Sequence, residues 1–294
     1  PLAYDIDDLI FEPAVTTGGH IAYLDALTQA EKEQWIGEAD LYRQALAFSD
    51  SVICTTAPLA KAAEAICARS FVLPNALSPR MEEAARAAIA IRNKRRSDGV
   101  TRMLFASGTP SHHRDLAVAA TGIASVLSRY NSCRLVILGY LDPQRCGGLQ
   151  PFADRIEWWP AVPFEQLLAT ISQCDINLCP LEEENPFCES KSAVRWLAAA
   201  AVGIPSIVSP SEPLLEGVID GVTGLVAGDP GQWGLAIESL MQDTPRSKVM
   251  GNAARIDSLG RFGFTAWAPR VLEVYGTILN SLISDKGLNA TYGA

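Results

Sequence analysis

The stretch NPFCESKSAVRWLAAAAVGIPSIVSP, residues 185–210, combines a polar loop, an Ala-rich helix, a Gly-Ile-Pro turn and a short apolar strand. Gly203 and Pro205 stand where the helix is expected to end, because glycine favours a helix terminus and proline cannot continue a helix. The run PSIV has no polar alternation, which is typical of a parallel strand covered on both faces. The stretch therefore predicts one helix–strand unit of an α/β fold.

The same unit recurs along the chain. Amphipathic segments such as RDLAVAATGIASVLSRY and PGQWGLAIESLMQD separate short apolar runs. The runs with the composition of strands are LAYDID, SVICTT, SFVLPN, RMLFASG, CRLVILGY, RIEWWP, INLCPL, PSIVSP and TGLVAG. Strands that alternate with helices predict parallel sheets with helices on both faces, and so an α/β fold built from Rossmann-like domains.

A break in this alternation lies between residues 75 and 101. We predict two Rossmann-like domains around it, the first incomplete, because LAYDID places the start of the chain almost inside a strand. The expected boundaries are a partial first domain at residues 1–80, a linker at 81–100, a second domain at 101–265, and a helix with a tail at 266–294. The missing part of the first domain would lie upstream or come from another chain.

Composition argues against several classes of protein. The formal net charge of −9 argues against a nucleic-acid partner, because phosphate backbones are bound by basic surfaces. The seven cysteines form no CxxC pair, which favours reduced core thiols of a cytoplasmic protein. The three histidines have no ligand spacing, so we expect no metal site. No apolar stretch reaches the roughly 18 residues of a transmembrane helix.

A basic cluster within the expected linker consists of Arg92, Lys94, Arg95 and Arg96. Such a cluster is typical of a solvated face. The alternative is that it holds the protein at the periphery of the inner membrane through anionic lipid headgroups.

The loop SGTPSHHRDL follows a predicted strand of the second domain, where open α/β sheets bind ligands. Gly108 allows a tight turn, and Thr109 and Ser111 offer hydroxyl groups. The amides at the start of the next helix and the charge of Arg114 favour an anion such as a diphosphate. The alternative is an ordinary strand-to-helix turn with a helix cap.

The loop EEENPFCESKSAV follows another strand of the same domain. The amides of Cys188 and Ser190 precede a helix and are expected to be free for ligand oxygens. Lys191 is suited to neutralising a leaving phosphate, and Glu189 to accepting hydrogen bonds from sugar hydroxyls. Capping of the helix is the alternative, and it is compatible with a ligand role.

Three further motifs are open to either a functional or a structural interpretation. The adjacent His112 and His113 are typical of solvated loop residues, but one of them is a candidate contact for a donor. Asp7 and Asp8, in the segment DIDD, suit surface charge, a metal, or contact with an acceptor across a cleft. The pair Trp158–Trp159 suits either a nucleobase pocket or core packing.

Taken in order, FASGTPSHHRDL, LVILGY, DINLCPLEEENPFCESKSAVRWLAAAAVGIPSIVS and EGVIDGVTGLVA resemble the GT-B glycosyltransferases of family 4, group 1. The segments DIDDL and TTAPLA…VLPNAL are similar to the N-terminal domain of bacterial members that build surface polysaccharide. The resemblance implies two facing Rossmann-like domains and a nucleotide-sugar donor held by the C-terminal one. It also implies retaining transfer without metal or other cofactor, to a glycan or lipid-linked acceptor.

The resemblance also implies roles for individual residues. Arg114, Lys191 and Glu189 would be catalytic, and Asp7 and Asp8 would lie on the acceptor side. The donor would be bound by Gly108, Thr109, His113, Phe187, Cys188, Ser190, Ser192 and Val162.

One position departs from the family pattern. Ala198 stands where the family has a glutamate that binds the donor ribose, and alanine cannot accept hydroxyl hydrogen bonds. Either Glu216 or the acidic run at residues 182–184 compensates, or donor binding is weaker, or the domain binds a partner or glycan without catalysis.

Overall fold

A computed structural model of the protein describes residues 2–94, 97–110, 112–142 and 147–285. These residues form nine strands in two sheets, and each strand overlaps one of the nine predicted runs, so the predicted α/β fold with parallel sheets is confirmed. Outside the described residues lie Arg95, Arg96, Ser111, Cys146 and the expected tail at 286–294.

The smaller sheet contains β1 (Ala3–Ile6), β2 (Ser51–Cys54) and β3 (Ser70–Val72), all parallel and in that order. Its helices are α1 (Pro13–Thr17), η1 (Ala22–Ala26), α2 (Gln29–Ala47) and α3 (Ala57–Glu64). Thr28 and Glu31 form a capping box at the start of α2, which fixes where this helix begins. Phe11, Leu46 and Leu59 are fully buried and form the centre of this core.

The larger sheet has six parallel strands in the order β6-β5-β4-β7-β8-β9. Their bounds are β4 Thr101–Ser107, β5 Cys133–Gly139, β6 Ile156–Trp159, β7 Ile176–Cys179, β8 Ser206–Val208 and β9 Gly224–Val226. Strand order reverses between β4 and β7, whose following loops therefore diverge and leave a crevice at their carboxyl ends. Both candidate ligand-binding loops follow these two strands.

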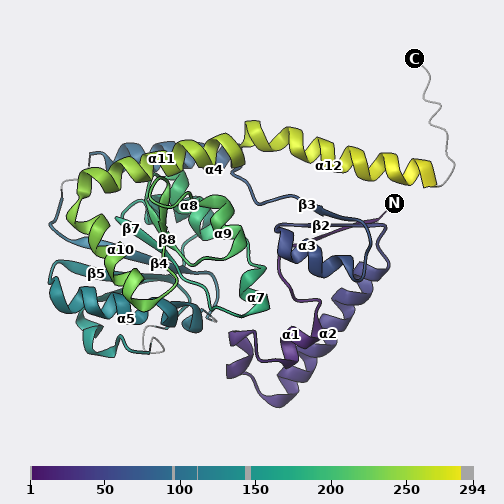
Figure 1. Ribbon diagram of the computed structural model, residues 1–294, viewed down its shortest axis with the longest axis horizontal. Helices are drawn as coiled ribbons and strands as arrows, with labels where there is room; N and C mark the ends of the chain where they lie inside the picture. The colour runs from purple at the N-terminus through teal and green to yellow at the C-terminus, as the bar shows by residue number, and fades with distance from the viewer. Residues whose placement is uncertain (1, 95–96, 111, 143–146, 286–294) are drawn as a thin grey trace.

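Helices cover both faces of the larger sheet, as alternate strand residues show. Leu104 of β4 packs in one core with α6 (Phe164–Ile171) and α8 (Val194–Ala201), whereas Met103 and Phe105 pack in the other with α5 (His113–Arg129) and α10 (Pro230–Gln242). In Figure 1, α4 (Pro79–Arg92) and α11 (Thr244–Phe262) lie on one side of this sheet and α5 on the other. The shorter elements are η3 (Gln150–Arg155), α7 (Pro186–Glu189) and α9 (Glu212–Gly217).

The chain passes twice between the two sheets at one place. Leu77 and Gly263 form an isolated parallel bridge, and the amide of Leu77 donates to the carbonyl of Phe262 at 2.8 Å. Helix α4 follows at once, and its Ala85 and Ala88 are buried in the core of the larger sheet. Most of the expected linker at 81–100 is therefore a packed helix of the larger part, not a free connection.

The last helix, α12 (Phe264–Asp285), returns to the smaller sheet (Figure 1). Val274 and Ile278 pack against Ile53 and Leu73, and the indole nitrogen of Trp267 donates to the carbonyl of Pro74 at 2.8 Å. The smaller part is therefore completed by residues from the end of the sequence.

Two further observations concern the described part of the chain. No helix in it combines the length and apolar character needed to span a membrane. Its six cysteines are all buried, and none forms a disulfide with another, which agrees with the predicted core thiols. Arg92 of the basic cluster donates to the carbonyls of Val202 at 3.5 Å and Gly203 at 3.2 Å, so it is tied to the end of α8.

Candidate functional site

The two parts of the chain enclose a cleft of about 830 Å³. One side, which we call the C-terminal wall, lies at the carboxyl ends of β4, β5 and β7 and at the start of α8, and includes Gly108, Thr109, His112, Tyr140, Lys191 and Arg195. The other side, the N-terminal wall, consists of Asp7, Asp8, Ile10, Ile21, Tyr23, Trp35 and Asn75. A cleft at the switch point of an open sheet is the expected position for a ligand.

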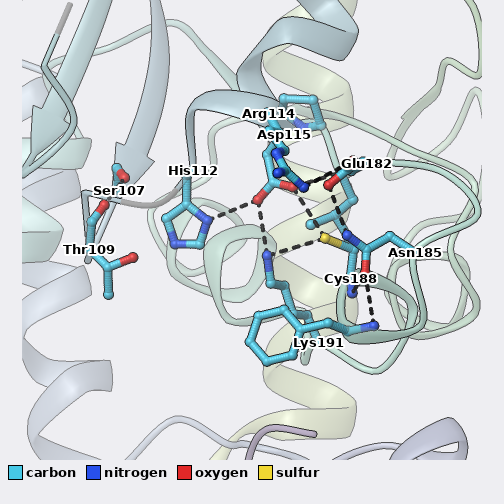
Figure 2. Close-up of polar contacts among 12 residues, drawn as sticks. Ser107, Thr109, His112, Arg114, Asp115, Glu182, Asn185, Cys188 and Lys191 are labelled. Atoms are coloured by element: carbon cyan, nitrogen blue, oxygen red, sulfur yellow. Dashed lines mark hydrogen bonds and ion pairs between the residues drawn. The ribbon is translucent and has the colours of Figure 1, made fainter. Parts of the chain in front are cut away.

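A buried carboxylate organises the C-terminal wall (Figure 2). Asp115, in the first turn of α5, is 2% exposed. Its Oδ2 lies 2.8 Å from Nδ1 of His112 and 3.1 Å from Nζ of Lys191. Nη2 of Arg195 lies 3.6 Å from the same oxygen. One carboxylate oxygen therefore holds three nitrogen-bearing side chains at the edge of the cleft.

The pKa of Asp115 shows how strongly this cluster favours the ionised form. Burial alone would raise its pKa, but the hydrogen bond with His112 and the charges of Lys191 and Arg195 outweigh burial and hold the pKa far below the usual range. Asp115 is therefore a carboxylate at any physiological pH. Its other oxygen accepts from the amide of Glu182 at 3.2 Å and from the thiol of Cys188 at 3.4 Å.

Lys191 and Arg195 give the C-terminal wall an excess of positive charge, because two cations share the single negative charge of Asp115. Arg195 also packs over the ring of Phe105, with Cζ 5.3 Å from the centroid. Its Nη1 is buried and has no hydrogen-bond partner among the described residues. A donor without a partner beside a cleft has a strong preference for an anionic ligand.

His112 is held with one nitrogen on Asp115, and its side chain lines the cleft. Burial lowers the pKa of His112, and the charges of Arg195 and Lys191 lower it further, while the hydrogen bond with Asp115 acts in the opposite direction. The imidazole is therefore neutral near pH 7. With Nδ1–H donated to Asp115, Nε2 is left as an acceptor for a ligand.

Arg114 does not reach the cleft, contrary to its predicted role at the diphosphate. Its Nη2 lies 2.6 Å from Oδ2 of Asp25 in η1, and its Nη1 donates to the carbonyl of Gly19 at 2.7 Å. Arg114 and Asp115 are adjacent on α5, and successive helical residues point about 100° apart. The carboxylate therefore faces Lys191 and Arg195, which line the cleft, and the arginine faces the smaller part. His113 also lies near Asp25, with its Nε2 3.8 Å from Oδ2 of that residue. His113 does not line the cleft on either wall.

The amides of residues 187–190 are not free for a donor sugar, which corrects the prediction from sequence. The side chain of Asn185 caps α7 and accepts from the amides of Phe187 at 3.0 Å and Cys188 at 3.4 Å. The amides of Glu189 and Ser190 donate to backbone carbonyls of the same turn. Asn185 followed by Pro186 is a typical helix start, but this one-turn helix was not predicted, and its formation consumes these donors. The uncapped start of α8, at Ala193, lines the cleft in its place.

Of the other residues predicted for catalysis or donor binding, some line the cleft and some do not. Gly108, Thr109, Phe187, Lys191 and Ser192 are on the C-terminal wall. Outside it lie Glu189, Cys188, Ser190 and Val162: Glu189 is exposed, Cys188 and Ser190 are buried, and Val162 follows β6.

Cys188 is not a reactive thiol. Burial, together with the charge of Asp115, raises its pKa to about 12, so the thiol remains protonated.

Hydrogen bonds join the loop after β7 to the smaller part. Oγ1 of Thr56 donates to the carbonyl of Ser190 at 2.8 Å, and Nδ2 of Asn75 donates to Oγ of Ser192 at 3.1 Å. Nδ2 of Asn185 donates to the carbonyl of His20 at 2.8 Å. Ser190, expected to bind the donor, is therefore an interdomain contact.

The predicted acceptor residues, Asp7 and Asp8, both lie on the N-terminal wall. Partial enclosure raises the pKa of Asp8, Lys191 across the cleft lowers it, and Asp7 raises it. No group of three or more His, Cys, Asp or Glu side chains within the described residues is placed to hold a metal ion.

The place of the family's ribose-binding glutamate is enclosed by the core. Ala198 is 9% exposed and packs with the residues around α8. Glu216 lines a smaller pocket that adjoins the main cleft and shares Ser192, Ala193 and Val194 with it, but Glu216 does not itself line the cleft. Glu182 accepts from Asn185 at 2.8 Å and lies 3.8 Å from Arg114. None of the carboxylates suggested as replacements lies on the C-terminal wall.

Sequence reasoning missed Asp115 and Arg195 as functional residues. Asp115 lies in the first turn of α5 and was not predicted as a site residue. Arg195 lies in the first turn of α8, whereas Lys191 lies in the loop before this helix, so their spacing in the sequence does not by itself indicate the pair. Tyr140 also lines the cleft. Trp158 does not line it: its side chain is 55% exposed, and its indole nitrogen donates to the carbonyl of Gly139 at 3.1 Å.

Residues 101–243 match the family described as Glycosyl transferases group 1. The chain is 32% identical over 139 residues to D-inositol 3-phosphate glycosyltransferase of Corynebacterium diphtheriae, a match that covers 47% of this chain and 30% of that protein. The enzyme of the same name from Segniliparus rotundus is 27% identical over 178 residues, which are 56% of this chain and 37% of that protein. The matched region thus spans about a third of these curated relatives.

Solved structures share the fold at low sequence identity. HepE of Anabaena, in complex with UDP and glucose, has a TM-score of 0.65 and 13% identity, covering 94% of this chain and 72% of that one. Sucrose-phosphate synthase of Thermosynechococcus elongatus has a TM-score of 0.63 and 18% identity, covering 95% and 68%. The comparisons agree with the predicted resemblance: the fold is that of GT-B glycosyltransferases, and residues 101–243 match the group 1 family.

Proposed function

We propose that the protein is a retaining glycosyltransferase that transfers a sugar from a nucleotide-sugar donor bound in the cleft. The observation that carries this proposal is the excess of positive charge on the C-terminal wall, where Lys191 and Arg195 share the charge of Asp115 and Nη1 of Arg195 has no described partner. A nucleoside diphosphate supplies the anion that this arrangement lacks. The complex of HepE with UDP and glucose supports this class of donor.

In the proposed reaction, the bond between the sugar's anomeric carbon and the diphosphate breaks, and a bond to an acceptor hydroxyl oxygen forms. The acceptor proton passes to a leaving phosphate oxygen, so the products are the glycoside and the nucleoside diphosphate. Lys191 and Arg195 stabilise the negative charge that develops on the leaving group, in place of a bound cation. Asp115 orients these two cations and does not contact the reacting atoms.

The acceptor lies between the donor and the N-terminal wall, where Asp7 and Asp8 are placed. The proposed role is the building of a bacterial surface glycan on the cytoplasmic side of the membrane, and it is supported by the fold shared with WaaG, a glycosyltransferase involved in lipopolysaccharide biosynthesis. The acceptor in that role is a glycan or a lipid-linked sugar.

The test is UDP binding by calorimetry, with GDP and dTDP as further probes. Lys191→Ala should weaken the affinity for the preferred diphosphate by about 10- to 100-fold, because it removes a charged hydrogen bond worth roughly 1.5–3 kcal/mol. Lys248→Ala is the matched control, since Lys248 is exposed on α11. Equal affinities in the two variants would exclude Lys191 from the donor site.

A second candidate is a domain that binds a nucleotide or glycan without catalysis. The observation that favours it is Ala198, which stands in the core where the family has its ribose-binding carboxylate. The two candidates differ in turnover. Release of UDP from UDP-glucose, faster with acceptor present, supports the enzyme, whereas UDP binding without any release supports the second candidate.

A further inference from the structure

The N-terminal wall of the cleft has a chemical character of its own. Its two charged members, Asp7 and Asp8, are both acidic, and none of the described residues that line it is a lysine or an arginine. The side chains of Asp7 and Asp8 make no hydrogen bond with described residues, so their oxygens are available to a ligand in the cleft.

The basic residues that line the cleft, Lys191 and Arg195, lie on the opposite wall, and Arg114 and Arg43 are already paired elsewhere. Lys191 belongs to the opposite wall and is 3.1 Å from Asp115. Arg114 is held by Asp25, and Arg43 is 3.1 Å from Glu12. An anionic group brought against the N-terminal wall would therefore meet two carboxylates and no available cation from that wall.

The apolar part of the N-terminal wall is aromatic. Tyr23 and Trp35 lie with ring centroids 5.8 Å apart at an angle of 55°. Tyr23 is 37% exposed, and Trp35 is half-buried, so both rings can be contacted from the cleft. Aromatic faces pack well against the C–H faces of sugar rings, while carboxylates accept hydrogen bonds from hydroxyl groups.

From this pairing of aromatic rings with carboxylates, we infer that the acceptor is an uncharged polyhydroxylated molecule, a saccharide or polyol, and not a phosphorylated one. Its C–H face contacts Tyr23 or Trp35, and its hydroxyl groups donate to Asp7 and Asp8. The inference rests on the proposed function, and it separates this chain from relatives whose name specifies a phosphorylated inositol. The raised pKa of Asp8 points the same way, because a site that already disfavours one negative charge disfavours a second.

The test compares ligands that differ only by a phosphate. The full chain is saturated with UDP, so that the C-terminal wall is occupied, and binding is followed by saturation-transfer NMR. One pair is myo-inositol and D-myo-inositol 3-phosphate, and the other is methyl α-glucoside and its 6-phosphate. In each pair the uncharged member should bind about tenfold more tightly, and this preference should shrink as salt is raised.

Variants of the N-terminal wall sharpen the test. Asp8→Lys should remove or reverse the preference, because it replaces a repulsive charge with an attractive one, and Asp7→Asn should reduce the preference. Trp35→Ala should weaken the binding of the uncharged ligands by about tenfold. Phe48→Ala, which truncates an aromatic side chain 82% exposed outside the cleft, should leave them unchanged.

The outcomes separate the two proposals. Equal or tighter binding of the phosphorylated members overturns the inference about the acceptor. Binding of UDP with no binding of either member also overturns it and leaves the donor site in place. Absence of binding of UDP, GDP and dTDP alike, measured for the wild type before any acceptor is added, counts against the proposed function itself.

Discussion

Lys191 and Arg114 were both expected to bind a diphosphate, but the fold places them in different regions with different contacts. Lys191 meets a buried carboxylate at the edge of the cleft, with its side chain 16% exposed. Arg114 meets Asp25 of the smaller part, and these two side chains are 31% and 40% exposed. The first cation lines the cleft, and the second joins the two parts of the molecule. A positive charge in the right loop is therefore not sufficient, because the direction of the side chain decides its role.

The largest expected effect is on the free energy of unfolding, and it concerns Asp115, the carboxylate beside Lys191. Asp115→Asn should lower the free energy of unfolding by about 3 kcal/mol, because it leaves Lys191 and Arg195 without their shared counter-charge. Urea denaturation measures this loss. The matched control, Asp25→Asn, should cost under about 1 kcal/mol, because its partner is well solvated. Similar losses in both variants would remove the distinction between the two regions.

The next effect concerns ligand affinity. Arg195→Gln should weaken UDP binding by about tenfold, since it removes the charge and the partner-free Nη1 beside the cleft. Arg114→Gln should change UDP affinity by less than about twofold. Calorimetry on the two variants measures both values. A larger loss for Arg114 than for Arg195 would restore the role predicted from sequence and contradict the geometry.

A smaller effect should appear in the pH dependence of stability. The pKa of Asp115 is lowered in the folded protein, so the folded state keeps this charge where the unfolded chain, with a pKa of about 3.9, takes up a proton. The stabilisation is complete above about pH 5 and is lost as the pH falls. The wild type should lose about 1 kcal/mol more than Asp115→Asn between pH 4 and pH 3. Parallel acid profiles of the two proteins would show that Asp115 is not the group responsible.

The smallest effect is expected on the interdomain side. A double-mutant cycle of Arg114→Ala and Asp25→Ala should give a coupling energy under about 1 kcal/mol, as is usual for ion pairs that are this exposed. Urea denaturation of the two single variants and the double variant measures it. A coupling above about 2 kcal/mol would mean that the contact between Arg114 and Asp25 contributes strongly to holding the two parts together.

The elements that were predictable have a strong apolar signal, and those that were missed do not. All nine strands were found because parallel strands buried on both faces need continuous apolar runs. Helices α4 and α11 were not identified. Their buried faces consist mainly of small residues, such as Ala85 and Ala88 in α4 and Gly251 and Ala254 in α11, which give little hydrophobic periodicity. A Cβ on Gly251 would clash with the carbonyl of Gly203, so the small residue allows α11 to lie close against α8.

The site was predictable as a pair of loops but not as a set of contacts. Both loops do lie at the cleft, because the carboxyl ends of β4 and β7 meet at the switch point of the sheet. The amides after Asn185 were expected to bind a ligand, but a one-turn helix uses them. Asp115 was overlooked because its two cationic partners, Lys191 and Arg195, are 76 and 80 residues away in the sequence.

The sequence by itself determined the strands, the α/β class and the family of the larger part, because these depend on local apolar patterns and on short motifs. Only the tertiary structure decided which charges face the cleft and which join the two parts. The rotation of α5 about its axis turns Asp115 inward and Arg114 outward, and the packing of α8 against β7 brings Arg195 to the same carboxylate. An ion pair depends on the distance between side chains, and that distance is fixed by packing between elements far apart in the chain.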